Sequence, residues 1–203
     1  TVPLDLTAAA SYKGIIPIVD FNGTAEEADT PSAAFWEMGD GAADVAFTAG
    51  FWCNLDGQAS EALLARKNGA NTSGWSVGTN NTMIRDVSAS AECRRARDTS
   101  PTTGVWHFLV FTYSGVGGGS AMNGGIWYED GAVAASTATN SVNYVAMETN
   151  AVTMELGTNK GDAVFFNGRL AGGPLGPFVV RTVAMTADDV NTLYQIGRRA
   201  LGL

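Results

Sequence analysis

The decapeptide WHFLVFTYSG, residues 106–115, is the strongest strand signal in the chain, and the fold can be worked out from it. Successive side chains of a strand alternate between two faces. Trp106, Phe108 and Val110 therefore share one face, and His107 shares the other face with the side chains at 109, 111 and 113. The segment also holds the only histidine of the chain, so it is either an active-site segment or a framework strand.

His107 has no neighbour in the sequence that would make it a catalytic base. A catalytic triad surrounds the imidazole with a nucleophile and a carboxylate, and these can come from distant segments. The residues next to His107 supply no such nucleophile. We therefore predict a structural histidine in a framework strand.

Short apolar segments recur along the chain between turn signals such as the Asn-Gly pair at residues 22–23 and the Asp-Gly pair at residues 130–131. In FTAGFWCNL, residues 47–55, the odd-numbered positions from Phe47 to Leu55 share one face. Many short strands separated by turn residues indicate an antiparallel sandwich. Further strands are predicted at residues 15–21, 62–66, 74–78, 81–85, 125–131, 132–135, 152–157, 164–170 and 177–184.

One amphipathic helix is predicted near the C-terminus. Thr186 is an N-cap candidate with Asp189 three residues later, which is a variant of the capping box. Met185 and Val190 occupy the two positions of a hydrophobic staple. The arginine pair at 198–199 suits the negative end of the helix dipole. The chain is thus expected to be nearly all β, with one short closing helix.

The bulk composition fits a single domain over residues 1–203. With 45% hydrophobic and 16% charged residues, the chain can bury a sizeable core. Its net charge of −8 argues against binding to nucleic acid and to anionic membranes, because both are bound by basic surfaces. No apolar run approaches the length that spans a bilayer, and the first residues do not read as a secretory signal.

Cys53 and Cys93 are the only cysteines, too few for a disulfide framework. Free thiols are the preferred interpretation, and a single bridge is the alternative. With one histidine and no CxxC pair, a zinc site of Cys and His ligands is not expected.

Eight segments in a fixed order carry a family resemblance: FTAGFWCNL (47–55), LLARKN (63–68), GWSVG (74–78), WHFLVFTYSG (106–115), IWYEDGAVAAS (126–136), MELGTN (154–159), FFNGRL (165–170) and MTADDVNTLY (185–194). Over residues 18–197 this order resembles the concanavalin A-like lectin/glucanase superfamily, in its laminin G-like branch. The resemblance implies an all-β, two-sheet antiparallel jelly roll in which the Trp-His pair at 106–107 belongs to the frame.

Two segments depart from the family pattern. Residues 171–177, AGGPLGP, stand where the family has an acidic pair and a short strand, which indicates a remodelled edge. A loop expected at residues 88–103 matches nothing in the pattern. It carries Arg94, Arg95 and Arg97, three of the 12 basic residues. These form either a solvated loop or a contact for an acidic partner surface or an anionic glycan, and both interpretations stay open.

The fold that this resemblance implies hosts hydrolases, lectins and structural modules, so function has to be argued from side chains. A glycosidase needs two carboxyl groups facing one bond, and the glucanases of the superfamily carry alternating acids on one strand. Here Glu26 and Asp29 lack the third acid, and Pro31 argues against a central strand. Glu129 and Asp130 are adjacent and would point to opposite faces. We therefore predict no enzymatic activity and no catalytic residues.

Calcium is the one cofactor that the sequence leaves open. The ion prefers oxygen ligands clustered in loops, and the resemblance implies calcium sites on the rim of laminin G-like domains. Asp20, Asn22 and Asp29 are the predicted ligands, with Asp40 and Asp44 as further candidates. The alternative is that these side chains lie in solvated loops without a metal.

Aromatic rings with Asn or Asp beside them offer a platform for sugars. Trp36, Trp75, Trp127, Tyr128 and Tyr144 are the candidates, although strand alternation places at least half of them in the core. From these we select Tyr128, Tyr144 and Trp75 as predicted ligand contacts.

Two functions follow as expectations. The first is a non-enzymatic structural or decoration protein on the surface of a virus particle, because freestanding sandwiches of the resembled family occur among phage virion proteins. It would bind a protein partner or itself as a homo-oligomer, and a chain that ends just after its closing helix suits this role. The second is a secreted, extracellular lectin-like domain that binds glycans, with or without calcium.

Overall fold

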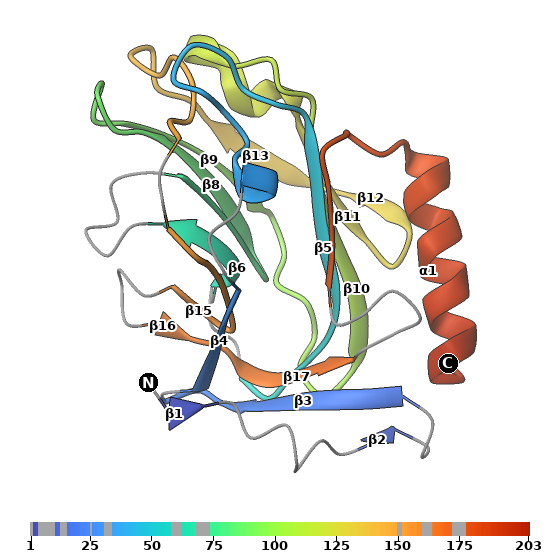
Figure 1. The fold of residues 1–203 in the computed structure, drawn as a ribbon. Helices are drawn as coiled ribbons and strands as arrows, with labels where there is room; N and C mark the ends of the chain where they lie inside the picture. The colour runs from blue at the N-terminus through green and yellow to red at the C-terminus, as the bar shows by residue number, and fades with distance from the viewer. Residues whose placement is uncertain are drawn as a thin grey trace.

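The computed structural model is a sandwich of two large β-sheets with one α-helix outside it (Figure 1). The residues that it describes are 2–3, 11–12, 16–24, 26–30, 34–57, 62–67, 74–149, 152–159, 164–171 and 178–203.

The first sheet has eight strands in the order β1-β4-β14-β6-β7-β8-β9-β13. Neighbouring strands are antiparallel except for β1 and β4, which are parallel. In that order the strands are β1 (Val2–Pro3), β4 (Glu26–Thr30), β14 (Met154–Leu156), β6 (Ala62–Lys67), β7 (Gly74–Gly78), β8 (Asn81–Asp86), β9 (Ala91–Arg97) and β13 (Ser136–Thr139).

The second sheet runs β12-β11-β10-β5-β17-β3-β2, and β18 also pairs with β5. Its strands are β12 (Ala132–Ala134), β11 (Gly125–Glu129), β10 (Trp106–Tyr113), β5 (Phe47–Leu55), β17 (Asn167–Ala171), β3 (Ile16–Asn22), β2 (Ser11–Tyr12) and β18 (Phe178–Arg181). The remaining elements are the strand pair β15 (Thr158–Asn159) and β16 (Val164–Phe165), the 3-10 segments η2 (Ala34–Trp36) and η3 (Gly118–Gly124), and the helix α1 (Ala187–Leu201).

The main core lies between the two sheets. β5 and β10 pair antiparallel along their length, from Phe47 opposite Tyr113 to Asn54 opposite Trp106. As the alternation predicts, the apolar side chains at odd-numbered positions of both strands point into this core. They meet the buried rings of Trp75 on β7 and Trp127 on β11, so the prediction of a two-sheet sandwich is confirmed.

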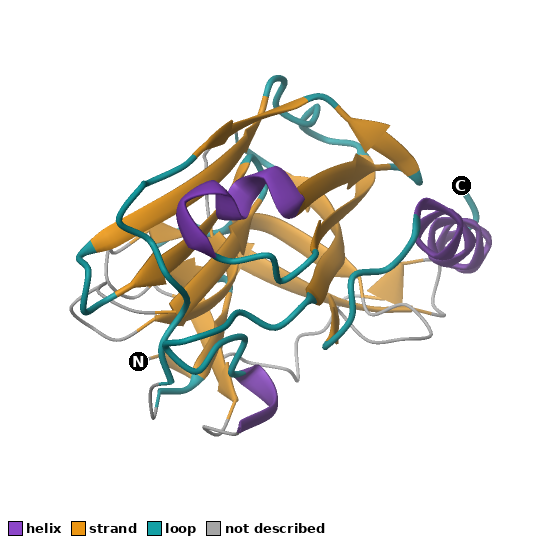
Figure 2. Ribbon diagram, turned by 90° about the horizontal axis from the view of Figure 1, so that it is seen from above, coloured by secondary structure: helices purple, strands orange, loops and turns teal. Residues whose placement is uncertain are grey.

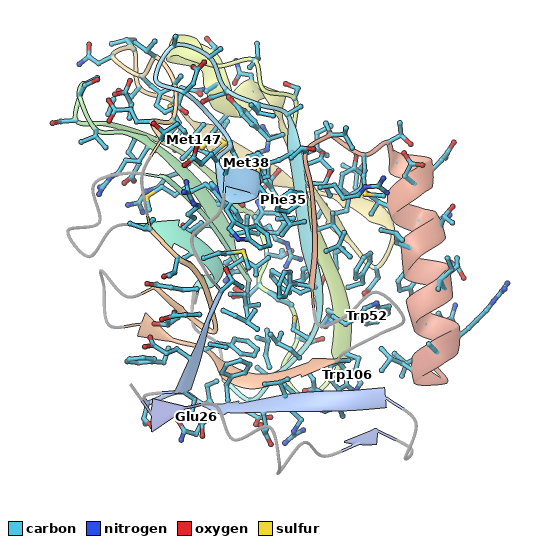
Figure 3. The ribbon with its side chains drawn as sticks, viewed as in Figure 1. Glu26, Phe35, Met38, Trp52, Trp106 and Met147 are labelled. Atoms are coloured by element: carbon cyan, nitrogen blue, oxygen red, sulfur yellow. The ribbon has the colours of Figure 1, made fainter. Side chains whose placement is uncertain are left out.

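A second, smaller core covers the other face of the β5–β10 pair, where α1 packs (Figure 2). Trp52 lies between the sheet and the helix (Figure 3). Its ring stacks on Phe108 at a centroid distance of 5.3 Å and on Tyr194 of α1 at 5.6 Å. The central strands are therefore buried on both faces.

The helix begins and ends as its sequence predicts. The Thr186 side chain accepts a hydrogen bond from the Asp189 amide, and the Asp189 carboxylate accepts one from the Thr186 amide. Val190 is buried beneath the first turn, next to Met185 in the smaller core. Gly202 ends the helix in the left-handed conformation, which glycine adopts without strain.

Two expectations about local structure are wrong. The region 88–103 is not one loop, because residues 91–97 form β9, paired with β8 and β13. Residues 26–30 form β4, paired between β1 and β14, and this strand ends just before Pro31. The expected remodelled edge at 171–177 lies, beyond residue 171, outside the described residues.

Cys53 and Cys93 are both buried and both free, as preferred from the sequence. Burial raises the pKa of the Cys53 thiol, which makes it an inert core group. Among the described helices, none combines the length and the hydropathy that a membrane span requires.

We predict that Gly197→Ala weakens the docking of α1, although alanine favours a helix over glycine. A Cβ at this position would lie 2.2 Å from Nε1 of Trp52, whose ring is held in the stack. The expected loss is about 1–3 kcal/mol of unfolding free energy, measured by chemical denaturation. Thr192→Ala, at an exposed site on the same helix, is the control and should cause no loss. Equal stability of both variants would contradict a tight Gly197–Trp52 contact.

Candidate functional site

His107 is part of a buried polar network at the end of β10. Its Nδ1 lies 3.0 Å from Oδ2 of Asp130 and 3.2 Å from Oε1 of Glu129. Its Nε2 lies 2.8 Å from the hydroxyl of Thr102. The backbone amide of Phe108 donates to the other oxygen of Asp130 at 2.8 Å and so fixes this carboxylate. The histidine thus has partners on both ring nitrogens.

The turn after β11 explains why both acids reach His107. Asp130 and Gly131 have positive φ angles of 50° and 82° and form the two-residue connection to β12. The expectation that Glu129 and Asp130 point to opposite faces is therefore wrong, because Asp130 lies in the turn and not in the strand. The Asp-Gly pair at 130–131 predicts this turn from the sequence, and the structure has it.

The two acids of the network pair with cationic or ionisable side chains of the protein itself. Arg97 forms an ion pair with Glu129 and donates to the Thr79 carbonyl oxygen at 3.2 Å. The hydrogen bond to Asp130 raises the pKa of His107 against the opposing effect of burial. His107 bridges the Thr102 hydroxyl and the Asp130 carboxylate through its two ring nitrogens, and we interpret this arrangement as a structural clamp.

The same three side chains, His107, Glu129 and Asp130, are the one group in the described part of the chain that could hold a metal ion. Their ligand atoms lie within 4.8 Å of one another. Metal binding requires a neutral imidazole, and the two carboxylates already face His107 and Arg97. The donor set therefore fits an internal ion network better than a metal centre.

We predict that the pKa of His107 lies above its ordinary value of about 6.5 and falls towards it in Asp130→Asn, which keeps an acceptor for the Phe108 amide. Since the folded-state pKa is raised, the protonated histidine stabilises the fold at low pH, and this contribution is lost as the pH rises through that pKa. Proton NMR gives the titration directly, because the chain has one histidine. An unchanged pKa in the variant would rule out Asp130 as the cause.

The three aromatic residues predicted to contact ligand are buried. Trp75, Tyr128 and Tyr144 are 1%, 3% and 2% exposed. Trp75 belongs to the main core and Tyr128 to the smaller core beneath α1. Their selection as ring platforms was wrong for this structure, because a buried ring has no free face for a sugar.

The side chain of Tyr144 is buried, and its hydroxyl contacts the half-buried carboxylate of Asp44. Its hydroxyl donates to Asp44 at 2.9 Å, and the hydroxyl of Tyr113 donates to the same Asp44 oxygen at 2.6 Å. The amide of Met147 donates to the other oxygen at 2.7 Å. Burial raises the pKa of Asp44. With three donors from its own chain, this acid ties loops together and leaves little room for calcium.

The predicted calcium ligands do not gather in one loop. Asp20 and Asn22 belong to β3 of the second sheet, whereas Asp29 belongs to β4 of the first sheet. Oδ2 of Asp20 lies 3.6 Å from Nε of Arg169. The side-chain oxygen of Asn22 accepts hydrogen bonds from the amide and the hydroxyl of Thr24. Asp40 accepts from the amides of residues 42 and 43.

The predicted basic contact is split between two faces of β9. Arg94 is exposed over 56% of its side chain and pairs with Glu92. Arg95 points between the sheets, where it donates to the Met122 carbonyl oxygen at 2.8 Å. Arg97 is buried on the same inner face. Strand alternation separates the three arginines, so they cannot form a single contact surface.

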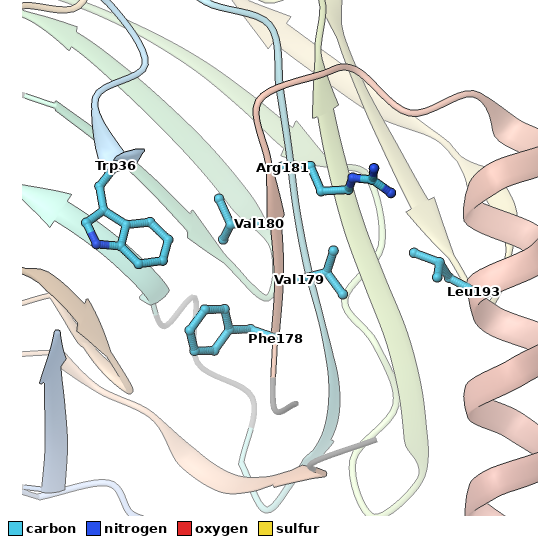
Figure 4. A pocket seen from close by; sticks show the side chains of 6 residues that line it. All are labelled: Trp36, Phe178, Val179, Val180, Arg181 and Leu193. Atoms are coloured by element: carbon cyan, nitrogen blue, oxygen red, sulfur yellow. The ribbon is translucent and has the colours of Figure 1, made fainter. Parts of the chain in front are cut away.

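A groove lies along β18, between η2 and α1 (Figure 4). Its volume is about 320 Å³. We call it the β18 groove, and its lining residues are Trp36, Phe178, Val179, Val180, Arg181 and Leu193. A second hollow of about 230 Å³ adjoins it and is lined by Phe35, Val180, Arg181, Thr182 and Val183.

Trp36 is held in place by a hydrogen bond to its backbone and by contacts of the two residues next to it. The indole of buried Trp75 donates to the Trp36 carbonyl oxygen at 3.0 Å. The next residue, Glu37, forms an ion pair with Arg66 at 3.2 Å. Phe35 meets the Trp36 ring edge-on at 4.8 Å and is 48% exposed. The half-buried Trp36 ring is thus fixed at the groove.

β18 is an edge strand in the described part of the sheet, because β5 is its one paired neighbour there. Phe178 and Val180 pack towards the main core and Trp36, while Val179 and Arg181 lie on the side of α1 (Figure 4). In an edge strand the N–H and C=O groups of alternate residues point away from the sheet. The groove thus combines an aromatic wall with backbone groups of β18 that pair with no other described strand.

The sequence matches the family profile described as "Concanavalin A-like lectin/glucanases superfamily" over residues 23–190. The chain belongs to this superfamily. The resemblance inferred from the strand motifs is therefore confirmed. A search among curated proteins found no match.

Solved structures of this superfamily's jelly-roll type share the fold. Domain 4 of the GH43 extracellular arabinanase AbnA from Geobacillus stearothermophilus is 15% identical, with a TM-score of 0.54 over 93% of this chain and 94% of that one. The SAP-like pentraxin of Limulus polyphemus is 16% identical, with a TM-score of 0.50 over 91% and 84%. The Ruminococcus gnavus IT-sialidase CBM40 is 9% identical, with a TM-score of 0.52 over 87% and 97%. At such identities the likeness shows the fold alone.

Proposed function

We propose that this protein is a non-catalytic carbohydrate-binding module and that its ligand lies in the β18 groove. The observation that carries the proposal is a hollow of about 320 Å³ lined by the Trp36 ring, Arg181 and β18, whose outer edge is unpaired among the described residues. This volume is at the lower end of the range of small-molecule sites, roughly 300–1,000 Å³.

The chemistry of the groove suits a sugar ring. A sugar has an apolar C–H face that packs on an aromatic ring, and hydroxyl groups that need hydrogen-bond partners. Trp36 and Phe178 supply the aromatic surface, the outer edge of β18 supplies backbone groups, and Arg181 supplies N–H donors. The exposed Phe35 extends the aromatic surface into the adjoining hollow.

Two of the similar structures support a glycan ligand. The arabinanase domain was solved in complex with arabinotriose, and CBM40 belongs to a sialidase. Both come from carbohydrate-active enzymes as domains with the jelly-roll fold. The transfer of a sugar ligand to this chain rests on the groove, since the fold by itself hosts many functions.

We propose a binding role without catalysis because the adjacent acids Glu129 and Asp130 serve another purpose. Glu129 is paired with Arg97, and Asp130 with His107, so neither carboxylate is available to protonate or attack a glycosidic bond. Neither residue lines the β18 groove.

The location of the module stays a prediction. Display on the surface of a virus particle, with a protein partner or a second copy, is the first expectation from the sequence, and secretion is the alternative. Both settings suit a module that binds glycans. Analytical ultracentrifugation of the purified chain and immunogold labelling of particles would test the assembly and the location.

We predict that Trp36→Ala lowers glycan affinity at least about tenfold, because the variant lacks the ring face on which the sugar packs. A tenfold loss corresponds to about 1.4 kcal/mol of binding free energy. The variant keeps the backbone carbonyl that accepts from Trp75. A glycan array, run with calcium and again with chelator, identifies the ligand, and calorimetry then measures its affinity for each variant.

Trp106→Ala is the matched control, because Trp106 packs against the smaller core and does not line the groove. It should change stability but leave the affinity unchanged. Arrays that stay blank under both conditions would overturn the proposed function, and binding that survives Trp36→Ala would place the glycan elsewhere.

A further inference from the structure

Arg181 differs from most described arginines, which form hydrogen bonds or ion pairs with other described residues. Arg66, Arg97 and Arg169 each form an ion pair with an acid. The exposed side chain of Arg181 makes no hydrogen bond and no ion pair with the residues that the structure describes. Its guanidinium is therefore free to bind a ligand, in a chain whose net charge is −8.

Arg181 lies where the β18 groove and the adjoining hollow meet. Arg181 and Val180 line both the β18 groove and the adjoining hollow of about 230 Å³. Trp36 lies at the first hollow and Phe35 at the second, with their rings in edge-on contact. A ligand that fills both hollows would cross the edge of β18 beside the guanidinium.

The acid that interacts with Arg181 is Asp189, whose carboxylate is held by the cap of α1. Asp189 interacts electrostatically with Arg181, and its pKa is lowered chiefly by the hydrogen bond from the Thr186 side chain. The Asp189 carboxylate accepts from the Thr186 hydroxyl at 2.7 Å and from the Thr186 amide at 3.1 Å. Because the helix cap holds Asp189, the fork of the Arg181 guanidinium stays open to a carboxylate from outside.

We propose that the β18 groove binds an acidic oligosaccharide of at least two rings, whose sugar carboxylate pairs with Arg181 between the two hollows. This inference rests on the proposed carbohydrate function and specifies its ligand class. The planar fork of arginine matches a carboxylate with two parallel hydrogen bonds. The chain carries a net negative charge, and Arg181 is the one cation among the described lining residues of the groove, so we expect selectivity for an acidic sugar to depend on it.

The carboxylate can come from two kinds of sugar, and matched pairs of probes distinguish them. Trigalacturonate and its carboxyl-reduced form differ only in the carboxyl groups of a uronic acid. The trisaccharide 3′-sialyllactose and lactose differ by a sialic acid. We expect one acidic probe to bind the full chain at least about tenfold more tightly than its neutral counterpart, as charge-assisted hydrogen bonds imply.

Arg181→Gln should remove most of this preference, and Arg181→Lys should restore part of it, because lysine keeps the charge but not the fork. Arg199→Gln is the charge-matched control, since this exposed arginine of α1 does not line the groove. Thermal unfolding of each variant verifies folding. The preference should also weaken as salt rises from about 0.05 to about 0.5 M.

The outcomes separate this inference from the proposed function. Neutral and acidic probes bound equally, with affinity lost in Trp36→Ala, would overturn the acidic ligand and keep the carbohydrate function. An acid preference that survives Arg181→Gln would also overturn it. No binding of any sugar would overturn both proposals. Binding of triglutamate but of no acidic sugar would replace the glycan with an acidic peptide added along β18.

Discussion

The structure depends on the pairing of β5 with β10, two central strands that are apolar on both faces. One face packs against the first sheet and forms the main core. The other face carries Trp52, Phe108 and Val110, which would be exposed without a cover. The helix α1 supplies this cover through stacking on Trp52 and the close contact at Gly197. The need to bury both faces therefore determines where the C-terminal segment lies.

The β18 groove exists because two short strands, β17 and β18, share the edge of β5 that lies opposite β10. β17 pairs with the half of β5 that ends at Leu55, and the four-residue β18 pairs with the half that begins after Phe47. The short β18 leaves an outer edge between η2 and α1. A strand edge flanked by aromatic side chains would favour aggregation if it were long and flat. Its four-residue length and the charge of Arg181 limit that risk.

The cationic side chains inside the sandwich differ in their contacts from Arg181 on the surface. Inside the sandwich, Arg95 binds a carbonyl oxygen, while Arg97 and His107 pair with two acids. Such buried charges require partners, because an unpaired one would be costly. Arg181 is exposed and forms no hydrogen bond or ion pair with the described residues. This contrast makes Arg181 a candidate for recognition, which the number of basic residues could not show.

The sequence by itself determined the local structure and the fold class. The period of two in residues 47–55 and 106–113, the capping box at Thr186 and the Asp-Gly turn at 130–131 depend on neighbours in the chain, and the structure has all of them. The order of the motifs then identified the superfamily.

Only the tertiary structure decided which side chains are free. Trp75 and Tyr144 look like surface aromatics in the sequence, but contacts with Trp36 and Asp44, far along the chain, hold them inside. The groove joins η2 to β18 and α1, which lie more than a hundred residues further along the chain, and no local pattern encodes that meeting. Periodicity reports the face of a strand, whereas a binding site depends on which segments cover that face and which edge they leave open.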